Sequence, residues 1–269
     1  MAESIFYQDS QLLFHRYGTG KKILLLFHGF GQDNRVFQSW EDILKEDYIL
    51  YAFDLYFHGQ SYWGSRKPLE KWDWKNILEQ FIRQEQLTRF EVAGFSMGGK
   101  FAMATLELFP ERIEKMYMLA PDGIKTSFWY SLATYPIATR YLFKSMILHP
   151  SRLHSLAKLL RAFRLVDNGL LRFAENQMNT EAKRRQVYYT WVYFRHLKFD
   201  LDKIASVLNQ KEIPFIMFVG KFDKVIQPKN MEGFLSKIRI KKFKVLEAGH
   251  NDLIAKSVEA IKKQNDSLC

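Results

Sequence analysis

One short segment places a serine where it could act as a nucleophile. Residues 94–99 read Gly-Phe-Ser-Met-Gly-Gly and lie between a run typical of a strand and a run typical of a helix. Small residues on both sides of Ser96 allow the backbone to turn sharply, which would hold the hydroxyl above the end of a strand. An ordinary Gly-Ser turn is the alternative, but the flanking strand and helix favour a nucleophile elbow.

A serine hydroxyl is a poor nucleophile, so a base and an orienting acid should accompany it. His250 lies in a Gly-His-Asn loop after the last expected strand and is the candidate base. Asp223 follows the strand expected at 215–219 and is the preferred acid, because a carboxylate there could fix the tautomer of the imidazole. Asp122, at the end of an earlier strand, is the competing acid. Either aspartate could instead only cap a helix or a turn.

A glycine-containing loop at 28–32, His-Gly-Phe-Gly-Gln, directly follows the first buried strand. Acyl transfer develops an oxyanion, which backbone N–H groups can stabilise. The N–H groups of Phe30 and of Met97, the residue after the candidate nucleophile, are the expected pair. A tight turn without a catalytic role is the alternative. His28 itself is expected to form structural hydrogen bonds beneath the loop.

The elements around these residues alternate between buried strands and helices. After a hairpin at 4–17, strands are expected at 22–27, 48–53, 90–94, 115–119, 215–219 and 242–246, and helices at 69–86, 97–109, 231–238 and 252–263. This alternation predicts an α/β fold with a mostly parallel, doubly wound sheet.

The alternation is interrupted by a segment without convincing strands. We therefore expect a first part of the core at 1–122, a helical cap at 123–211 and a second part of the core at 212–269. Within the cap, the apolar residues of 152–164 fall on one arc of a helix. Thr180 could cap another helix, along which Val187, Trp191 and Phe194 form a stripe.

The positive charge of the chain is concentrated in this cap. The formal net charge is +11, and residues 123–211 contain fifteen Lys and Arg but only five Asp and Glu. The basic run Lys183, Arg184 and Arg185 lies in the first turn of an expected helix, where the helix dipole disfavours cations. A solvated surface is the simplest interpretation, and an anionic substrate or a peripheral contact with an anionic membrane is the sharper one. No motif supports nucleic-acid binding.

These motifs, taken in order, resemble those of the α/β-hydrolase superfamily, in the branch with a serine nucleophile and a helical cap. The segment at 54–61, Asp-Leu-Tyr-Phe-His-Gly-Gln-Ser, is similar to another loop of that family, although Phe57 stands where glycine is usual. The resemblance implies a Ser96, Asp223 and His250 triad without a cofactor or metal. Serine at the elbow distinguishes the chain from haloalkane dehalogenases and epoxide hydrolases of the same fold, which use aspartate there.

The resemblance implies acyl transfer to water through an acyl-enzyme but not the substrate, and we expect the substrate to be a carboxylic ester or a related small acyl compound. A carbon–carbon bond hydrolase acting on a keto acid, and a low-turnover ligand-binding or receptor protein, are the alternatives. The single cysteine, Cys269, allows no intramolecular disulfide, and residues 1–10 lack the pattern of a signal peptide. A cytoplasmic location is therefore expected.

Overall fold

The computed structural model describes residues 2–125, 128–163, 175 and 177–266. The chain divides into two compact units. Unit 1 comprises residues 1–66, 70–125 and 197–269, and unit 2 comprises residues 67–69 and 126–196. Most of unit 2 is thus an insertion into the sequence of unit 1.

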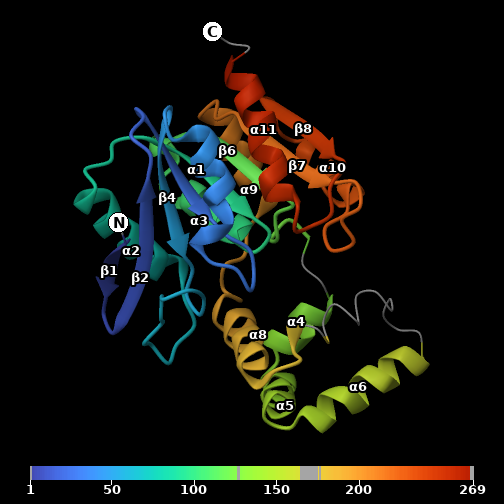
Figure 1. The fold of residues 1–269 in the computed structure, drawn as a ribbon. Helices are drawn as coiled ribbons and strands as arrows, with labels where there is room; N and C mark the ends of the chain where they lie inside the picture. Colours follow the sequence, from blue (N-terminus) through green and yellow to red (C-terminus); the bar gives the residue numbers. More distant parts are fainter. Residues whose placement is uncertain (1, 126–127, 164–174, 176, 267–269) are drawn as a thin grey trace. The chain divides into compact units, whose positions relative to one another are not determined.

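Unit 1 is built on one eight-stranded sheet with the order β1-β2-β4-β3-β5-β6-β7-β8 (Figure 1). The strands are β1 (Ala2–Tyr7), β2 (Ser10–Tyr17), β3 (Lys22–Phe27), β4 (Tyr48–Asp54), β5 (Phe90–Phe95), β6 (Ile113–Leu119), β7 (Phe215–Gly220) and β8 (Lys241–Leu246). β2 is antiparallel to both of its neighbours, whereas β3 to β8 are parallel to one another. The mostly parallel sheet predicted from the sequence is confirmed.

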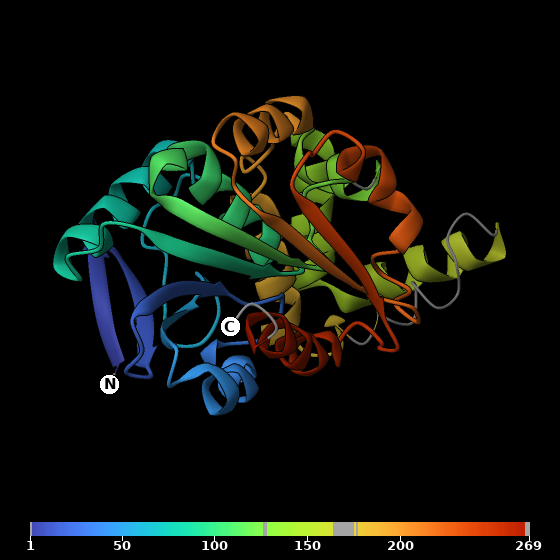
Figure 2. The ribbon, with the colours of Figure 1, turned by 90° about the horizontal axis from the view of Figure 1, so that it is seen from above.

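Helices cover both faces of this sheet (Figure 2). α1 (Gln38–Leu44) and α11 (Leu253–Asp266) pack together on one face, where the indole Nε1 of Trp40 donates a 2.9 Å hydrogen bond to the carbonyl of Ile254. On the other face, α3 (Gly98–Leu108) contacts both α2 (Lys71–Gln84) and α9 (Leu201–Gln210), and the short α10 (Glu232–Leu235) contacts α9. All six residues of the central strand β5 are buried, as expected for a strand covered on both faces.

The strand order reverses between β3 and β5, so the loops that follow these two strands are neighbours. In open α/β sheets, ligands bind outside the carboxyl ends of the strands at such a point. The loop at 28–32 follows β3, and the candidate elbow at Ser96 follows β5. The topology alone therefore brings two of the expected motifs together.

Unit 2 is helical in its described part. It contains α4 (Phe128–Thr134), α5 (Ile137–Leu148), α6 (Pro150–Ala162) and α8 (Glu181–Tyr193). The Thr180 hydroxyl accepts a 3.2 Å hydrogen bond from the Lys183 N–H, so the predicted N-cap of α8 is present. The end of the helix expected at 152–164 lies partly outside the described residues.

The boundary of the inserted segment differs from the one expected at residue 211. α9 belongs to unit 1, because its apolar side chains Ile204, Ala205 and Leu208 are buried and the helix contacts α3. In the described part of the chain, no helix is both long enough and apolar enough to cross a membrane.

Candidate active site

The candidate nucleophile lies on a sharp turn between β5 and α3. Ser96 has a backbone φ of +49°, in the left-handed region that residues with a side chain rarely adopt. Two close contacts require glycine beside it. A Cβ atom at Gly98 would lie 2.0 Å from the Phe27 carbonyl oxygen, and one at Gly94 would lie 2.6 Å from the Gly98 carbonyl oxygen. The glycines therefore let α3 start directly against β3 and β5, which holds the serine in its strained conformation.

His250 reaches this serine from the loop after β8. Its Nε2 atom lies 3.0 Å from the Ser96 Oγ, and its Nδ1 atom lies 2.6 Å from Oδ2 of Asp223. An ionised carboxylate only accepts hydrogen bonds, so Nδ1 must carry the ring proton. Nε2 is then free to accept the proton of the serine hydroxyl. The imidazole also packs against the ring of Phe95, with 4.9 Å between the ring centroids.

Asp223 is held by the turn that follows β7. Its side chain is completely buried, and its Oδ1 atom accepts hydrogen bonds of 2.8 Å from the N–H groups of Val225 and Ile226. One carboxylate oxygen is thus fixed by the backbone, while the other faces the imidazole. The three residues predicted for the triad lie in one hydrogen-bonded line.

Asp122, the competing acid, has different partners. Its Oδ2 atom lies 2.9 Å from the Lys100 Nζ atom, and its Oδ1 atom accepts the N–H of Gly123 at 2.7 Å. Its own backbone N–H donates to the Ser96 carbonyl at 2.8 Å. Asp122 therefore supports the backbone of the elbow, and its carboxylate neutralises the buried Lys100 ammonium rather than facing His250.

The two backbone N–H groups expected to form an oxyanion hole have no acceptor in the part of the chain that the structure describes. Among the described residues, neither Phe30 nor Met97 donates its N–H to a protein atom. Neighbouring groups are occupied, since Gly29 donates its N–H to the Gln32 side chain at 3.0 Å. Unpaired donors at the ends of β3 and β5 are what an oxyanion hole needs.

His28 forms structural hydrogen bonds beneath this loop, as expected. Its Nδ1 donates to the Gly29 carbonyl at 2.7 Å, and its Nε2 accepts the Leu55 N–H at 3.0 Å. The ring is fully buried, and burial lowers the pKa of His28 below its ordinary value. Because Nε2 accepts a hydrogen bond, the ring is neutral, and it links the loop after β3 to the end of β4.

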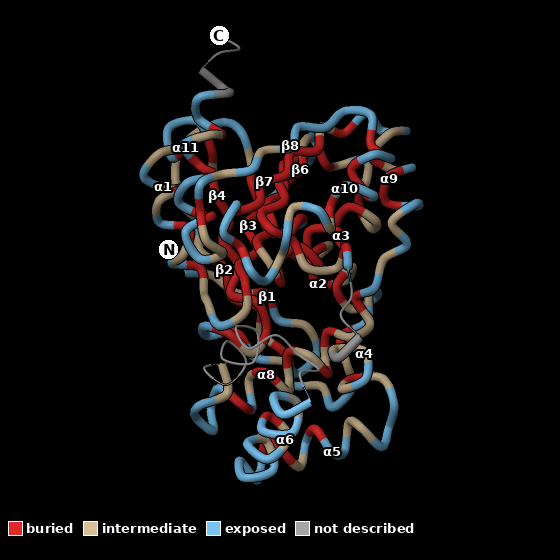
Figure 3. Tube along the Cα trace, turned by 90° about the vertical axis from the view of Figure 1, so that its right-hand side faces the viewer, coloured by how far each residue is buried: buried red, intermediate tan, exposed pale blue. Residues whose placement is uncertain are grey.

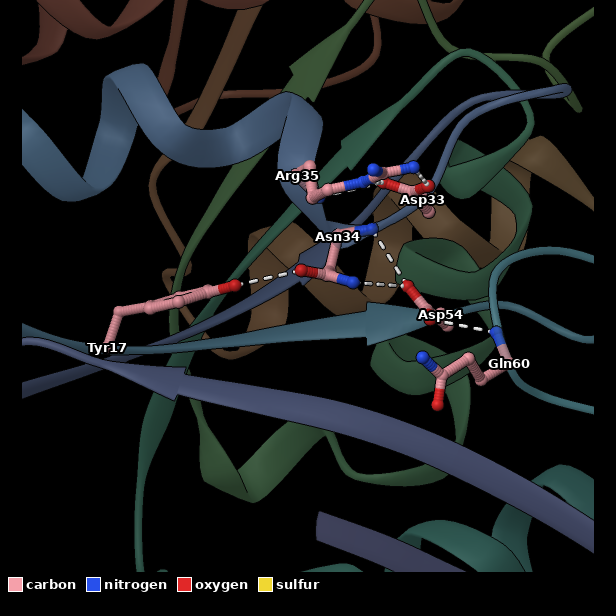
Figure 4. A network of polar contacts seen from close by, with 6 residues as sticks. All are labelled: Tyr17, Asp33, Asn34, Arg35, Asp54 and Gln60. Carbon is pink, nitrogen blue, oxygen red and sulfur yellow. Dashed lines mark hydrogen bonds and ion pairs between the residues drawn. The ribbon is translucent and has the colours of Figure 1, made fainter. Parts of the chain in front are cut away.

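A buried polar network, which the sequence did not reveal, supports the same loop (Figure 4). Asp54 Oδ1 accepts from both the N–H and the side-chain amide of Asn34 at 2.8 Å, and Asp54 Oδ2 accepts from the Gln60 N–H at 3.1 Å. The Tyr17 hydroxyl donates to the Asn34 side chain at 2.8 Å. Asp54 belongs to the family-like loop at 54–61, but nothing in the sequence marked Asn34 as its partner.

Phe57 stands where the family pattern has glycine, yet its backbone still adopts the left-handed conformation that favours glycine. Phe57 has a φ of +67°, and Gly59 has a φ of +52°. A Cβ atom at Gly59 would lie 2.0 Å from the Asp54 carboxylate, whereas the loop accepts the phenylalanine at a cost of about 1 kcal/mol in backbone strain. His58, between them, is buried, and burial lowers its pKa to about 3.

Comparison with known proteins agrees with this geometry. A family model described as "alpha/beta hydrolase fold" matches residues 22–257. The chain belongs to this family. Its similarity to a solved esterase from Thermogutta terrifontis covers 99% of the chain and 98% of that protein, with a TM-score of 0.72 at 19% identity. Similarity to an enol-lactonase from Burkholderia xenovorans covers 98% of both chains, with a TM-score of 0.68 at 15% identity. At these identities the likeness shows the fold alone.

Similarity in sequence to curated α/β-hydrolase relatives is more local. The chain is 33% identical to the pimeloyl-[acyl-carrier protein] methyl ester esterase of Legionella pneumophila over 122 residues, which are 44% of this chain and 46% of that protein. The chain spans less than half the length of the curated relatives it matches. Within the described ranges, no three His, Cys, Asp or Glu side chains lie together as a metal site would require.

Proposed function

We propose that the chain is a serine hydrolase that cleaves a carboxylic ester, or a related small acyl substrate, through an acyl-enzyme. The observation that carries the proposal is the unbroken line from Ser96 through His250 to Asp223, with the serine held at a positive φ. The names of several relatives support ester chemistry, including that of the Legionella pneumophila esterase.

The first half of the proposed reaction forms the acyl-enzyme. Ser96 Oγ attacks the ester carbonyl carbon as its proton passes to Nε2 of His250. The oxygen of the tetrahedral intermediate accepts hydrogen bonds from the N–H groups of Phe30 and Met97. Collapse of the intermediate expels the alcohol, which takes the proton from the imidazolium. Asp223 stabilises the imidazolium and keeps Nε2 directed at the serine.

The second half releases the acid. A water molecule loses a proton to Nε2 of His250 and attacks the acyl carbon, and the resulting intermediate expels Ser96. No other proton carrier is needed, because the same imidazole acts as base and then as acid in each half. The sequence-based expectation of a cytoplasmic enzyme without a cofactor is part of this proposal.

Pre-steady-state kinetics with p-nitrophenyl esters test the proposal directly. The wild-type protein should release a burst of p-nitrophenol close to one equivalent per active site when deacylation is slower than acylation. Ser96→Ala should abolish the burst and lower kcat by a factor on the order of 10⁴ to 10⁶. A fluorophosphonate should label the wild type and fail to label the variant. Wild-type turnover by Ser96→Ala would overturn the proposal.

The same preparation separates the two alternatives. Cleavage of a keto acid at a carbon–carbon bond without ester turnover would identify the other hydrolase class. Stoichiometric labelling of Ser96 with negligible turnover of a series of esters would identify a ligand-binding protein on this fold.

A further inference from the structure

Unit 2 exposes an unusual amount of apolar surface. Of fifteen large hydrophobic side chains exposed among the described residues, seven lie between residues 132 and 163. They are Leu132, Ile137, Tyr141, Leu142, Leu148, Leu159 and Phe163. Three of them are exposed by about two thirds: Ile137 by 64%, Tyr141 by 69% and Phe163 by 67%. Such concentrations mark binding surfaces rather than ordinary solvated faces.

The packing of unit 2 does not require these side chains. α5 already has a separate inner face, on which Phe143, Met146 and Ile147 are buried. The ring of Phe143 lies 5.8 Å from that of Trp191 and 5.5 Å from that of Tyr188, both on α8. Ile137, Tyr141, Lys144 and Leu148 follow one another at intervals of four, three and four residues, so they form a stripe along the outside of α5.

The helix that follows also exposes apolar side chains. The sequence places the apolar residues of α6 on one arc, yet Leu159 and Phe163 at its end remain exposed. In Figure 3 most of α6 is coloured as exposed. Residues 128–162 contain five Lys and Arg but no Asp or Glu. Lys144 and Lys158 are exposed, and neither has an ion-pair partner among the described residues. Arg161 is paired with Glu175 at 3.2 Å, so the unpaired positive charge on these helices includes Lys144 and Lys158 beside the exposed apolar side chains.

The basic run at 183–185, which the sequence suggested for such a surface, has another explanation. Arg184 is buried, and its guanidinium donates to the carbonyls of Ile147 at 3.1 Å and Met178 at 3.3 Å. Arg185 forms an ion pair of 2.7 Å with Glu181 one turn earlier. Arg184 and Arg185 thus have structural partners within unit 2. Their charges do not indicate an interaction surface, whereas the exposed side chains of α5 and α6 do.

We propose that the outer surface of α5 and α6 binds a bilayer that contains anionic lipid. This α5–α6 face consists of Ile137, Tyr141, Leu142, Lys144, Leu148, Lys158, Leu159 and Phe163. Aliphatic and aromatic side chains enter the boundary between headgroups and acyl chains, while lysines stay at the headgroups and attract their phosphates. Residues 128–162 contain no Asp or Glu, and the nearby Glu175 is neutralised by Arg161, so these helices offer an anionic surface little repulsion. The proposal is independent of the catalytic one.

Co-sedimentation of the full chain with vesicles tests this proposal. The protein should bind vesicles of phosphatidylcholine with 30% phosphatidylglycerol more tightly than vesicles of phosphatidylcholine alone, and 0.5 M salt should weaken the binding. Each lysine near an anionic surface contributes roughly a fivefold gain in affinity, so Lys144→Gln with Lys158→Gln should raise the Kd on the order of 20-fold. Tyr141→Ser with Ile137→Ser should weaken binding both with and without 0.5 M salt, because salt does not screen the insertion of apolar side chains.

Matched variants show whether the position of the charges matters. Lys21→Gln with Lys242→Gln removes the same charge from two exposed lysines of unit 1 and should leave the Kd within twofold of the wild type. Ser96→Ala should bind as the wild type does, whatever its effect on hydrolysis. Equal losses in the two lysine pairs would overturn the proposal, as would equal binding to both vesicles. It would also be overturned by a concentration-dependent dimer, abolished by Tyr141→Ser, in a protein that binds neither vesicle.

Discussion

The two units bury their side chains in different ways. In unit 1, β5 and β7 are buried along their whole length, and Ser96 and Asp223 project from the turns that follow them. In unit 2, α5 buries one face and exposes apolar side chains on the other. Close packing helps to hold side chains within about 0.5 Å of the geometry that a reaction requires. The exposed apolar and basic side chains of α5 and α6 instead offer a surface that a partner can bind. The two proposals thus assign the reaction to unit 1 and the recognition of a membrane to unit 2.

Separate replacement of Asp223 and Asp122 should give the largest difference in kcat between two variants of unit 1. Asp223→Asn should lower kcat for a p-nitrophenyl ester by a factor on the order of 10⁴, because an amide in that position favours the wrong imidazole tautomer. Asp122→Asn should lower kcat far less, since its carboxylate faces Lys100 and its backbone N–H to Ser96 is unchanged.

Circular dichroism and thermal unfolding of both variants provide the control for folding. If Asp122→Asn were the more damaging variant in a folded protein, the acid would have to be reassigned, and the separation of catalytic and supporting carboxylates drawn from the structure would fail.

The contrast between buried and exposed positions can also be tested inside unit 2. Arg184→Met removes charged hydrogen bonds to the carbonyls of Ile147 and Met178 and should lower the free energy of local opening of α5 and α8 by about 2 kcal/mol. Lys183→Met changes the neighbouring exposed cation and should stay within about 0.5 kcal/mol of the wild type. Amide hydrogen exchange of the two helices measures both. Equal effects would mean that Arg184 contributes nothing beyond its charge.

The pH dependence of stability tests burial in unit 1. Burial lowers the pKa of His58 to about 3, so between pH 3 and 6.5 the unfolded chain binds a proton there that the folded protein does not. The contribution of His58 to the free energy of unfolding is therefore complete above pH 6.5 and is lost as the pH falls towards 3. One such proton changes the free energy of unfolding by about 1.4 kcal/mol per pH unit.

Denaturant unfolding at several pH values between 4 and 6 should detect this proton. His58→Gln should reduce the slope of the free energy of unfolding against pH by about one proton. The buried His28 should account for part of the slope that remains in the variant. An unchanged slope in the variant would show that the ring of His58 is protonated in the folded protein as well.

The sequence could indicate the candidate residues whose positions depend on local chain geometry. Ser96 directly follows a strand, Asp223 and His250 lie within four residues of a strand end, and the small residues around Ser96 indicate the turn itself. The order of these residues along the chain then limits which aspartate and histidine can be the acid and the base, because this fold uses serine, acid and histidine in that order.

Contacts between distant residues could not be predicted in the same way. Asn34 lies 20 residues before Asp54, and no spacing rule connects an amide in one loop with a carboxylate at the end of a strand. Residues 183–185 form one basic run in the sequence, but successive residues on a helix point about 100° apart. Arg184 consequently faces inward while Lys183 faces solvent. Patterns of residue type do not show which member of such a run is buried.

The insertion between β6 and β7 has a consequence for how the protein folds. These strands are neighbours in the sheet, yet 95 residues separate the end of one at Leu119 from the start of the other at Phe215. The entropy lost on joining them depends on the length of flexible chain that must close. Helices of unit 2 that form early would shorten that length. We therefore expect the order of folding to run from the inserted helices to the last two strands, so that His250 meets Ser96 only in the final step of assembly.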